Sequence, residues 1–199
     1  MKKISILAFF LFLFSAVASA HGPVRGKMTA TVDIEASPEA VWEIIKDYHD
    51  MSWHPAIAGV EGSGGNEKGA TRVLTLADGG TITEELKKYD AAKMSYKYKI
   101  IDMSVVKTIQ HSGKEEKVFV LAVDNYQGTL TVKKKGNASV VKWVATYYRG
   151  YMNNNPPVEL NEATADEQVT AVLTAGLTSL LQKFEPNTLP TAITFTMKR

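Results

Sequence analysis

The sequence predicts an α+β fold in which a curved antiparallel sheet wraps around one long C-terminal helix. Segments of alternating apolar and polar residues recur between residues 28 and 149, and short turn sequences separate them. One long helical repeat follows, from about residue 159 to residue 184. This helix has a single apolar face, and the sheet is the only large surface that can bury it.

The chain begins with a segment that is expected to be removed. Residues 1–20 contain a Lys-Lys pair, an apolar run from Ile4 to Phe14 and small residues before Ala20. This order is typical of a secretory signal peptide, so we expect export and cleavage after Ala20. The run is too short to span a bilayer as a helix, so no membrane anchor is expected.

Composition excludes several functions. The chain has 23 basic and 21 acidic residues, and loss of the signal would leave 21 of each. A net charge near zero does not fit nucleic-acid binding, which needs a clustered basic surface. The chain has no cysteine, which excludes disulfides, thiolate metal sites and a cysteine nucleophile. Beyond the signal, Tyr and Trp outnumber Phe, and rings with a polar tip suit a partly wet wall.

Two short helices are predicted after the first strand. Residues 21–27 form a polar lead-in, and residues 28–35 alternate as a strand does. Ser37 is a good N-cap and Pro38 suits the first helical position, so a short helix begins there. The segment 50–55 predicts a second turn or brief helix that ends at its proline.

The middle of the chain predicts a meander of strands. Links of hairpin length, rich in Gly, Asn and Asp, separate the strands and make the sheet antiparallel. The predicted strands are 57–62, 70–76, 81–88, 94–101, 104–110, 117–123, 126–133 and 139–149.

The C-terminal helix carries the strongest periodic signal in the sequence. Its apolar residues recur at helical spacing on one face. They are Val169, Val172, Leu173, Gly176, Leu177, Leu180, Leu181 and Phe184. Pro186 ends the helix, so we expect one domain over 28–185, and the tail 186–199 has no assigned structure.

Arg72 and Glu84 are candidate cavity residues because each shares a strand face with apolar neighbours. Arg72 alternates with Leu74, and Glu84 alternates with Ile82 and Leu86. If these faces point inward, the two charges must pair, since a lone buried charge is too costly. Such a pair would recognise the polar group of a ligand. In the opposite register, both side chains would lie in solvent.

Further candidates for a ligand-binding wall are Trp53, His54, Trp143 and Tyr147. Ordinary core packing is the alternative for these rings. Gly176 interrupts the apolar face of the helix, where a larger residue would fill space. It predicts either room for a ligand or a close approach of the helix to the sheet.

The loop 148–157 is rich in residue types that favour interfaces. We expect Arg149, Tyr151 and Met152 to contact a protein partner, with the 104–123 hairpin as a second contact. A plain connecting loop is the alternative.

No metal site is expected within the domain, because its three histidines, His49, His54 and His111, fall on separate predicted elements. Cleavage after Ala20 would make His21 the N-terminal residue, whose amine and imidazole can chelate copper. No catalytic residue and no cofactor are assigned.

Several segments resemble the START-like, or SRPBCC, superfamily of polyketide cyclase/dehydrase-like proteins. They are Val32–Trp42, Trp53–Pro55, Gly69–Arg72 and the strand that bears Trp143. The resemblance covers about residues 28–184 and implies a helix-grip fold, in which an antiparallel sheet grips a long C-terminal helix. It says little about function, because the superfamily includes cyclases, lipid carriers and hormone receptors.

Other segments look like the MxaD-type branch of this superfamily. They are His21–Pro23, Asp50–Pro55, Asp78–Ile82, Lys93–Tyr96 and Tyr148–Asn154. The resemblance implies a periplasmic accessory protein that helps a quinoprotein methanol dehydrogenase pass electrons to its cytochrome.

The sequence therefore favours a periplasmic, non-catalytic protein that binds a small apolar molecule, a redox partner in methanol oxidation, or both. One alternative is a cyclase- or dehydratase-type enzyme that uses His54, Arg72 and Glu84. Another is a copper-handling protein that uses His21.

Overall fold

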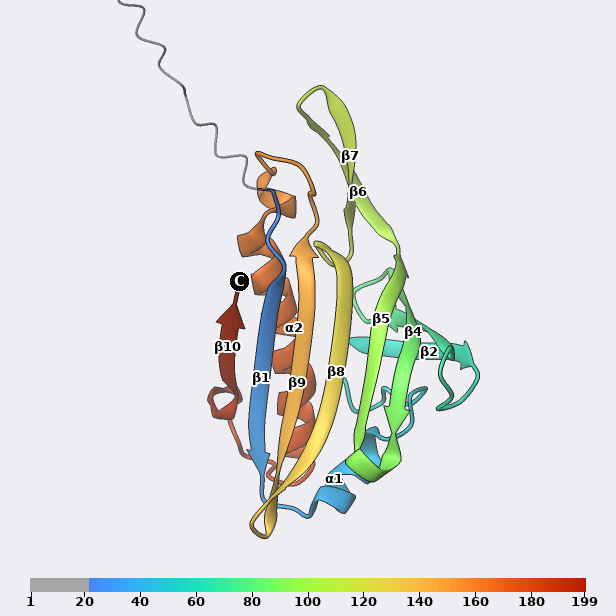
Figure 1. The fold of residues 1–199 in the computed structure, drawn as a ribbon, viewed down its shortest axis with the longest axis vertical. Helices are drawn as coiled ribbons and strands as arrows, with labels where there is room; N and C mark the ends of the chain where they lie inside the picture. The colour runs from blue at the N-terminus through green and yellow to red at the C-terminus, as the bar shows by residue number, and fades with distance from the viewer. Residues whose placement is uncertain (1–21) are drawn as a thin grey trace, which may run out of the picture.

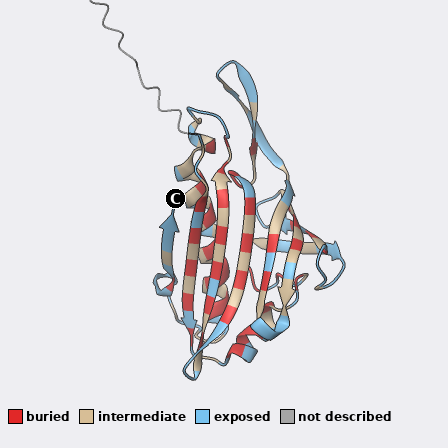
Figure 2. Cartoon of the chain, in the orientation of Figure 1, coloured by how far each residue is buried: buried red, intermediate tan, exposed pale blue. Residues whose placement is uncertain are grey.

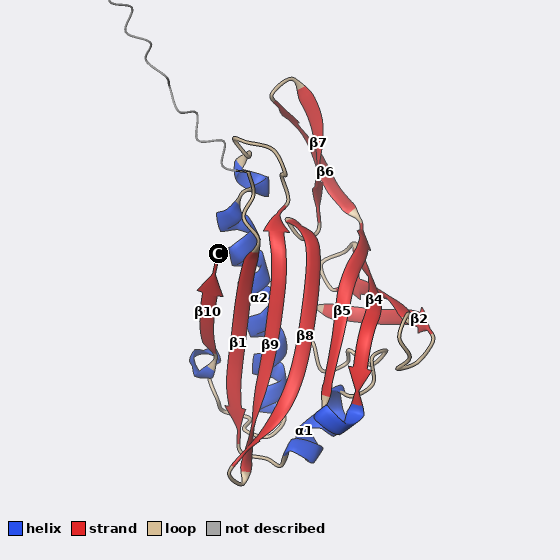
Figure 3. Ribbon diagram, viewed as in Figure 1, coloured by secondary structure: helices blue, strands red, loops and turns tan. Residues whose placement is uncertain are grey.

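Eight strands form one antiparallel sheet with the long helix α2 across one face (Figure 1). The structure is a computed structural model that describes residues 22–199, so the predicted signal peptide and His21 lie outside the described residues. The strand order is β10-β1-β9-β8-β5-β4-β3-β2, and β6 and β7 form a separate two-stranded sheet. The predicted α+β helix-grip architecture is confirmed (Figure 3).

The elements are β1 (Gly26–Ile34), α1 (Pro38–Ile45), β2 (Ile57–Ser63), β3 (Thr71–Leu76), β4 (Thr81–Asp90), β5 (Ser95–Met103), β6 (Val105–His111), β7 (Lys114–Phe119), β8 (Val123–Lys135), β9 (Ala138–Arg149), α2 (Glu162–Gln182) and β10 (Thr194–Lys198). Single 3-10 turns lie at Ala91–Lys93, Val158–Leu160 and Pro190–Ala192.

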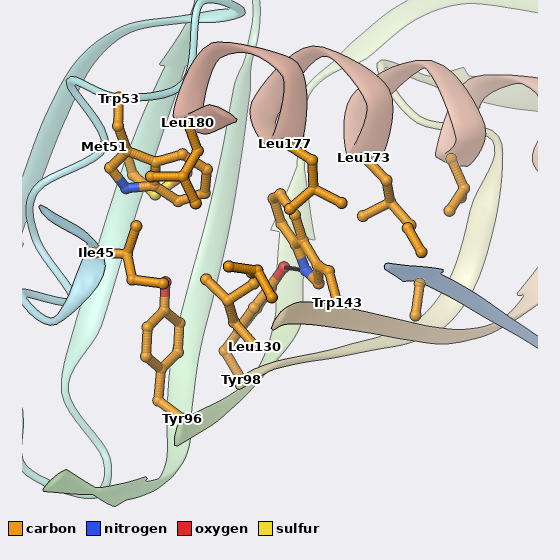
Figure 4. Close-up of a cluster of buried hydrophobic side chains, with 14 of the residues drawn as sticks. Ile45, Met51, Trp53, Tyr96, Tyr98, Leu130, Trp143, Leu173, Leu177 and Leu180 are labelled. Carbon is orange, nitrogen blue, oxygen red and sulfur yellow. Dashed lines mark hydrogen bonds between the residues drawn. The ribbon is translucent and has the colours of Figure 1, made fainter. Parts of the chain in front are cut away.

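Alternation of side chains builds the core. Every second residue of β9 from Ser139 to Arg149 is buried, and β8 and β1 show the same pattern (Figure 2). These residues point toward α2, which packs mainly on β9 and β1. Leu173, Leu177 and Leu180 of α2 are fully buried against this face (Figure 4).

Only one of the two predicted short helices is present. Ser37 caps α1 as expected, since its Oγ accepts the Ala40 N–H at 3.2 Å. The segment 50–55 forms turns, which is one of the two predicted possibilities, and the brief helix is absent. The carboxylate of Asp47 accepts the His49 N–H at 2.9 Å, and that of Asp50 accepts the Ser52 N–H at 2.9 Å. Such local side-chain bonds compete with helix formation.

The β6–β7 hairpin projects beyond the main sheet (Figure 1). Its second strand is shifted from the prediction, since β7 ends at Phe119 instead of continuing to Val123. Val118 at the base of the hairpin joins a small second hydrophobic cluster with Ala122, Tyr151 and Leu160. The hairpin is therefore fixed to the rest of the fold at its base.

The unassigned tail adds a strand to the sheet. β10 pairs antiparallel with β1, with Met197 opposite Met28, and Arg199 pairs with Asp166 of α2. Within residues 22–199, no helix is long and apolar enough to cross a membrane.

Candidate ligand-binding cavity

A cavity of about 440 Å³ lies between the sheet and α2. Its apolar lining comes from the turns after α1, the inner faces of the strands and α2, namely Met51, Ala56, Ile57, Leu74, Leu76, Ala77, Ile82, Ile100, Val120, Leu121, Ala171 and Val172. Ala77, Asp78 and Ala171 are exposed, so they mark the mouth of the cavity. The volume lies within the range that is usual for small-molecule sites.

Arg72 and Glu84 both point inward and line this cavity. They stand opposite each other on β3 and β4, and they are only 1 % and 4 % exposed. Arg72 Nε and Nη2 lie 2.8 Å and 2.6 Å from Glu84 Oε2, and Nη1 donates to the Tyr48 carbonyl. The guanidinium also lies 4.1 Å above the centre of the Tyr48 ring. The inward register, one of the two alternatives, is therefore the one observed.

The two charges compensate each other in the interior. Burial raises the pKa of the Glu84 carboxyl, and the charge and hydrogen bonds of Arg72 oppose this effect. Burial alone would lower the pKa of Arg72, but Glu84 and the neighbouring tyrosines raise it. An ion pair with no net charge results, and it stands at the wall of an otherwise largely apolar cavity.

His54 lines the cavity, but both of its ring nitrogens already have partners. Nε2 lies 3.1 Å from the Val172 carbonyl of α2, and Nδ1 accepts the Ala56 N–H at 3.2 Å. Burial lowers the pKa of His54 to about 4, and the positive charge of Arg72 contributes in the same direction. The ring is thus neutral and serves to connect the segment after α1 to α2.

The other predicted wall residues divide into two groups. Trp143 lines the cavity, and its indole N–H donates to the Tyr98 hydroxyl at 3.0 Å (Figure 4). Trp53 lies behind it in the core, with 5.7 Å between the two ring centres. Tyr147 also lies outside the cavity, and its hydroxyl donates to Asp166 at 2.8 Å.

Gly176 leaves no room for a ligand. A Cβ at this position would lie 2.6 Å from His54 Cδ2 and 2.8 Å from Trp143 Cζ3. The expectation of ligand space here is therefore wrong, and Gly176 is absent from the cavity lining. The glycine allows two rings to approach the helix closely, and it lets the His54 ring reach the helix backbone.

We expect Gly176→Leu to lower the free energy of unfolding by about 1–3 kcal/mol, because it overpacks a filled site. Neither ring can move away freely, since hydrogen bonds hold both. Urea unfolding measures the effect. The matched control is Glu167→Leu on the exposed side of α2, which should change stability by no more than about 0.5 kcal/mol. Equal stability of both variants would show that the rings of His54 and Trp143 can move to make room for the new side chain.

The loop after β9 does not expose the predicted partner-binding residues. Arg149 is buried, donating to the Tyr151 and Asn153 carbonyls at 2.7 Å and pairing with Glu162. Tyr151 is buried in the second hydrophobic cluster. Arg149 and Tyr151 therefore hold the loop in place and cannot form the expected surface. Only Met152 of the three is exposed, at 43 %.

The histidines outside the cavity have structural contacts. His49 Nε2 lies 3.0 Å from the Thr71 carbonyl, and His111 Nε2 lies 2.7 Å from the Asn155 carbonyl. In the described part of the chain, no three His, Asp or Glu side chains are grouped to hold a metal ion.

Several cavity residues were not singled out from the sequence, among them Tyr98, Tyr126 and Gln168. Tyr98 and Tyr126 face inward from β5 and β8, and alternation along these strands could have indicated both. Gln168 gave no such signal. Its side-chain oxygen accepts the Ala122 N–H at 2.6 Å and so fixes one side of the mouth to α2.

The chain belongs to the family described as polyketide cyclase/dehydrase and lipid transport, which matches residues 25–185. No curated protein matches it. XoxI from Bacillus cereus is 27% identical with a TM-score of 0.62, and the match covers 80% of this chain and 95% of XoxI. An uncharacterised protein from Bacillus thuringiensis is 26% identical with a TM-score of 0.62, over 80% of this chain and 98% of that one.

The fold is also shared with norcoclaurine synthase from Thalictrum flavum, whose structure holds dopamine and hydroxybenzaldehyde. The two are 13% identical, with a TM-score of 0.55 over 95% of this chain and 99% of the synthase. At this identity the likeness concerns the fold alone.

Proposed function

We propose that the protein binds a small, largely apolar molecule in the cavity between the sheet and α2. The observation that carries the proposal is the cavity itself, which has an apolar lining, a buried charge pair and an exposed mouth. Small-molecule sites combine these features, since apolar walls supply affinity and a few polar groups fix orientation. A family described by lipid transport and cyclase activity is consistent with such a ligand.

Binding without catalysis is favoured over a cyclase- or dehydratase-type reaction. A general acid or base must have a free proton site within reach of the substrate. Both nitrogens of His54 have protein partners, and Arg72 donates to Glu84 and to the Tyr48 carbonyl. These bonds hold His54 and Arg72 in a structural arrangement, so the proposal assigns them no proton transfer, and Glu84 alone does not make an acid–base pair.

We propose, further, that the protein acts in the periplasm as an accessory factor in methanol oxidation. The signal-like segment 1–20 and the resemblance to MxaD-type proteins support this role. Mixing the purified protein with a methanol dehydrogenase and its cytochrome tests it, since faster cytochrome reduction is expected. Met152→Ser should weaken the effect if this exposed side chain is part of the contact, whereas an unchanged rate on adding the wild-type protein would contradict the role.

Ligand binding is tested by blocking the mouth of the cavity. We expect N-phenyl-1-naphthylamine, a neutral apolar dye, to fluoresce with the wild-type protein. Ala171→Trp places a large side chain at the mouth and should weaken dye binding at least about 10-fold, a loss of about 1.4 kcal/mol. Ala171 is exposed, so the melting temperature should not change.

The matched control is Glu167→Trp, which adds the same side chain to an exposed position of α2 outside the cavity. It should bind the dye as the wild type does. A wild-type protein that gives no dye fluorescence, or equal loss in the two tryptophan variants, would overturn the proposal.

A further inference from the structure

Glu84 offers one free carboxylate oxygen at the wall of the cavity. Its Oε2 accepts the Arg72 Nε–H at 2.8 Å and lies 2.6 Å from Nη2. In residues 22–199, no hydrogen bond joins a protein donor to Oε1, and 6 % of the Glu84 side chain is exposed. Glu84 lines the cavity, so a ligand can supply the missing donor.

Arg72 does not offer a matching positive site. Its Nε donates to Glu84, its Nη1 donates to the Tyr48 carbonyl, and its Nη2 is in ion-pair contact with Glu84, so its positive charge is already balanced by the carboxylate. The pair has no net charge, so a ligand carboxylate would place a second negative charge beside Glu84. A ligand ammonium group would likewise place a second positive charge beside Arg72. In an apolar cavity, an uncompensated charge is costly.

The tyrosine hydroxyls that line the cavity are neutral. Tyr98 and Tyr126 line the same cavity, and burial raises the pKa of both hydroxyls above the ordinary value. A tyrosine hydroxyl can donate to a ligand oxygen as well as accept from a ligand. Apart from the exposed Asp78 at the mouth, the cavity thus presents one charged acceptor together with neutral hydroxyl groups.

We propose that the ligand is an uncharged apolar alcohol or phenol whose hydroxyl group donates a hydrogen bond to Glu84 Oε1. This assignment rests on the proposed cavity function and narrows it to a chemical class. A hydroxyl group meets both conditions, because it supplies the missing donor and carries no charge. Its own oxygen remains free to accept from a tyrosine.

Three compounds of similar size test the assignment by displacement of N-phenyl-1-naphthylamine at pH 7.5. They are 1-octanol, its isomer heptyl methyl ether, which has no donor, and octanoate, which is negatively charged. Since hydrogen bonds to charged groups are the stronger ones, 1-octanol should displace the dye at about 10-fold lower concentration than either of the others. Equal displacement by the three compounds, or tightest binding of octanoate, would overturn the assignment.

Glu84→Gln supplies an independent test, because it keeps the shape of the side chain and removes its charge. Arg72 then lacks a counter-charge, so octanoate should gain at least about 10-fold in affinity and the preference for 1-octanol should shrink. An unchanged preference in a folded variant would contradict the role of Glu84. If circular dichroism shows that the variant is unfolded, the wild-type series alone decides.

The two proposals fail in different ways. A wild-type protein that binds neither the dye nor any of the three compounds refutes the cavity function and this assignment with it. A protein that binds the dye, is blocked by Ala171→Trp and does not discriminate among the three compounds refutes the alcohol assignment alone.

Discussion

Arg72→Met is expected to lower the free energy of unfolding by about 3–5 kcal/mol, because it leaves the Glu84 carboxylate buried without its partner. Methionine fills much of the space of the arginine side chain but cannot donate a hydrogen bond. The variant also loses the contact of the guanidinium with the Tyr48 ring and carbonyl. Urea unfolding at pH 7 measures the change.

The double variant Arg72→Met/Glu84→Leu separates loss of the pair from loss of packing. Replacing both members of a buried ion pair with apolar side chains is often nearly neutral. We therefore expect the double variant to recover most of the stability that the single variant loses. A single variant as stable as the wild type would show that Glu84 is solvated through the cavity.

The stability of the protein is expected to fall by about 3 kcal/mol between pH 7 and pH 4 because of His54 alone. Its pKa is about 4 in the folded protein, against an ordinary value of 6.5. Between these values, the unfolded chain binds a proton that the folded protein does not, so unfolding becomes easier as the pH falls. Above about pH 6.5 both states are neutral at His54, and its contribution is constant.

His54→Gln tests this pH dependence, because an amide can still donate to the Val172 carbonyl but does not titrate. Urea unfolding of the wild type and the variant at several pH values between 4 and 7 gives the two slopes. The variant should have the shallower slope, whereas His49→Gln keeps His54 and serves as the matched control. Parallel curves for the wild type and His54→Gln would contradict the prediction.

The fold could be predicted because its signals are local. Alternation along the strands and the apolar face of the C-terminal helix depend on neighbouring residues only. The same alternation placed Arg72 with Leu74 and Glu84 with Ile82, and this is why their inward register could be considered at all. Pairing of the two charges then followed from the cost of burying either one alone.

The remaining features depend on contacts between distant segments. His54 contacts the Val172 carbonyl, which lies 118 residues further along the chain. The sequence could not show this contact, so it could not exclude that His54 binds a ligand or transfers a proton. Gly176 is tightly packed only because two rings from other elements meet there. Tyrosine is a residue type that favours interfaces, but Tyr151 is buried against Val118 at the base of the β6–β7 hairpin.

The pairing of β1 sets an order for folding. Its two neighbours in the sheet are β9 and β10, and Thr31 pairs with Thr194, which follows it by 163 residues. Pairing across such long loops carries a large entropic cost and slows folding. The hairpins between β2 and β5 can form first, since their partners are adjacent in sequence. The first strand of the sheet to be synthesised is therefore among the last to be paired. Until β10 is synthesised, one edge of β1 stays open to other chains.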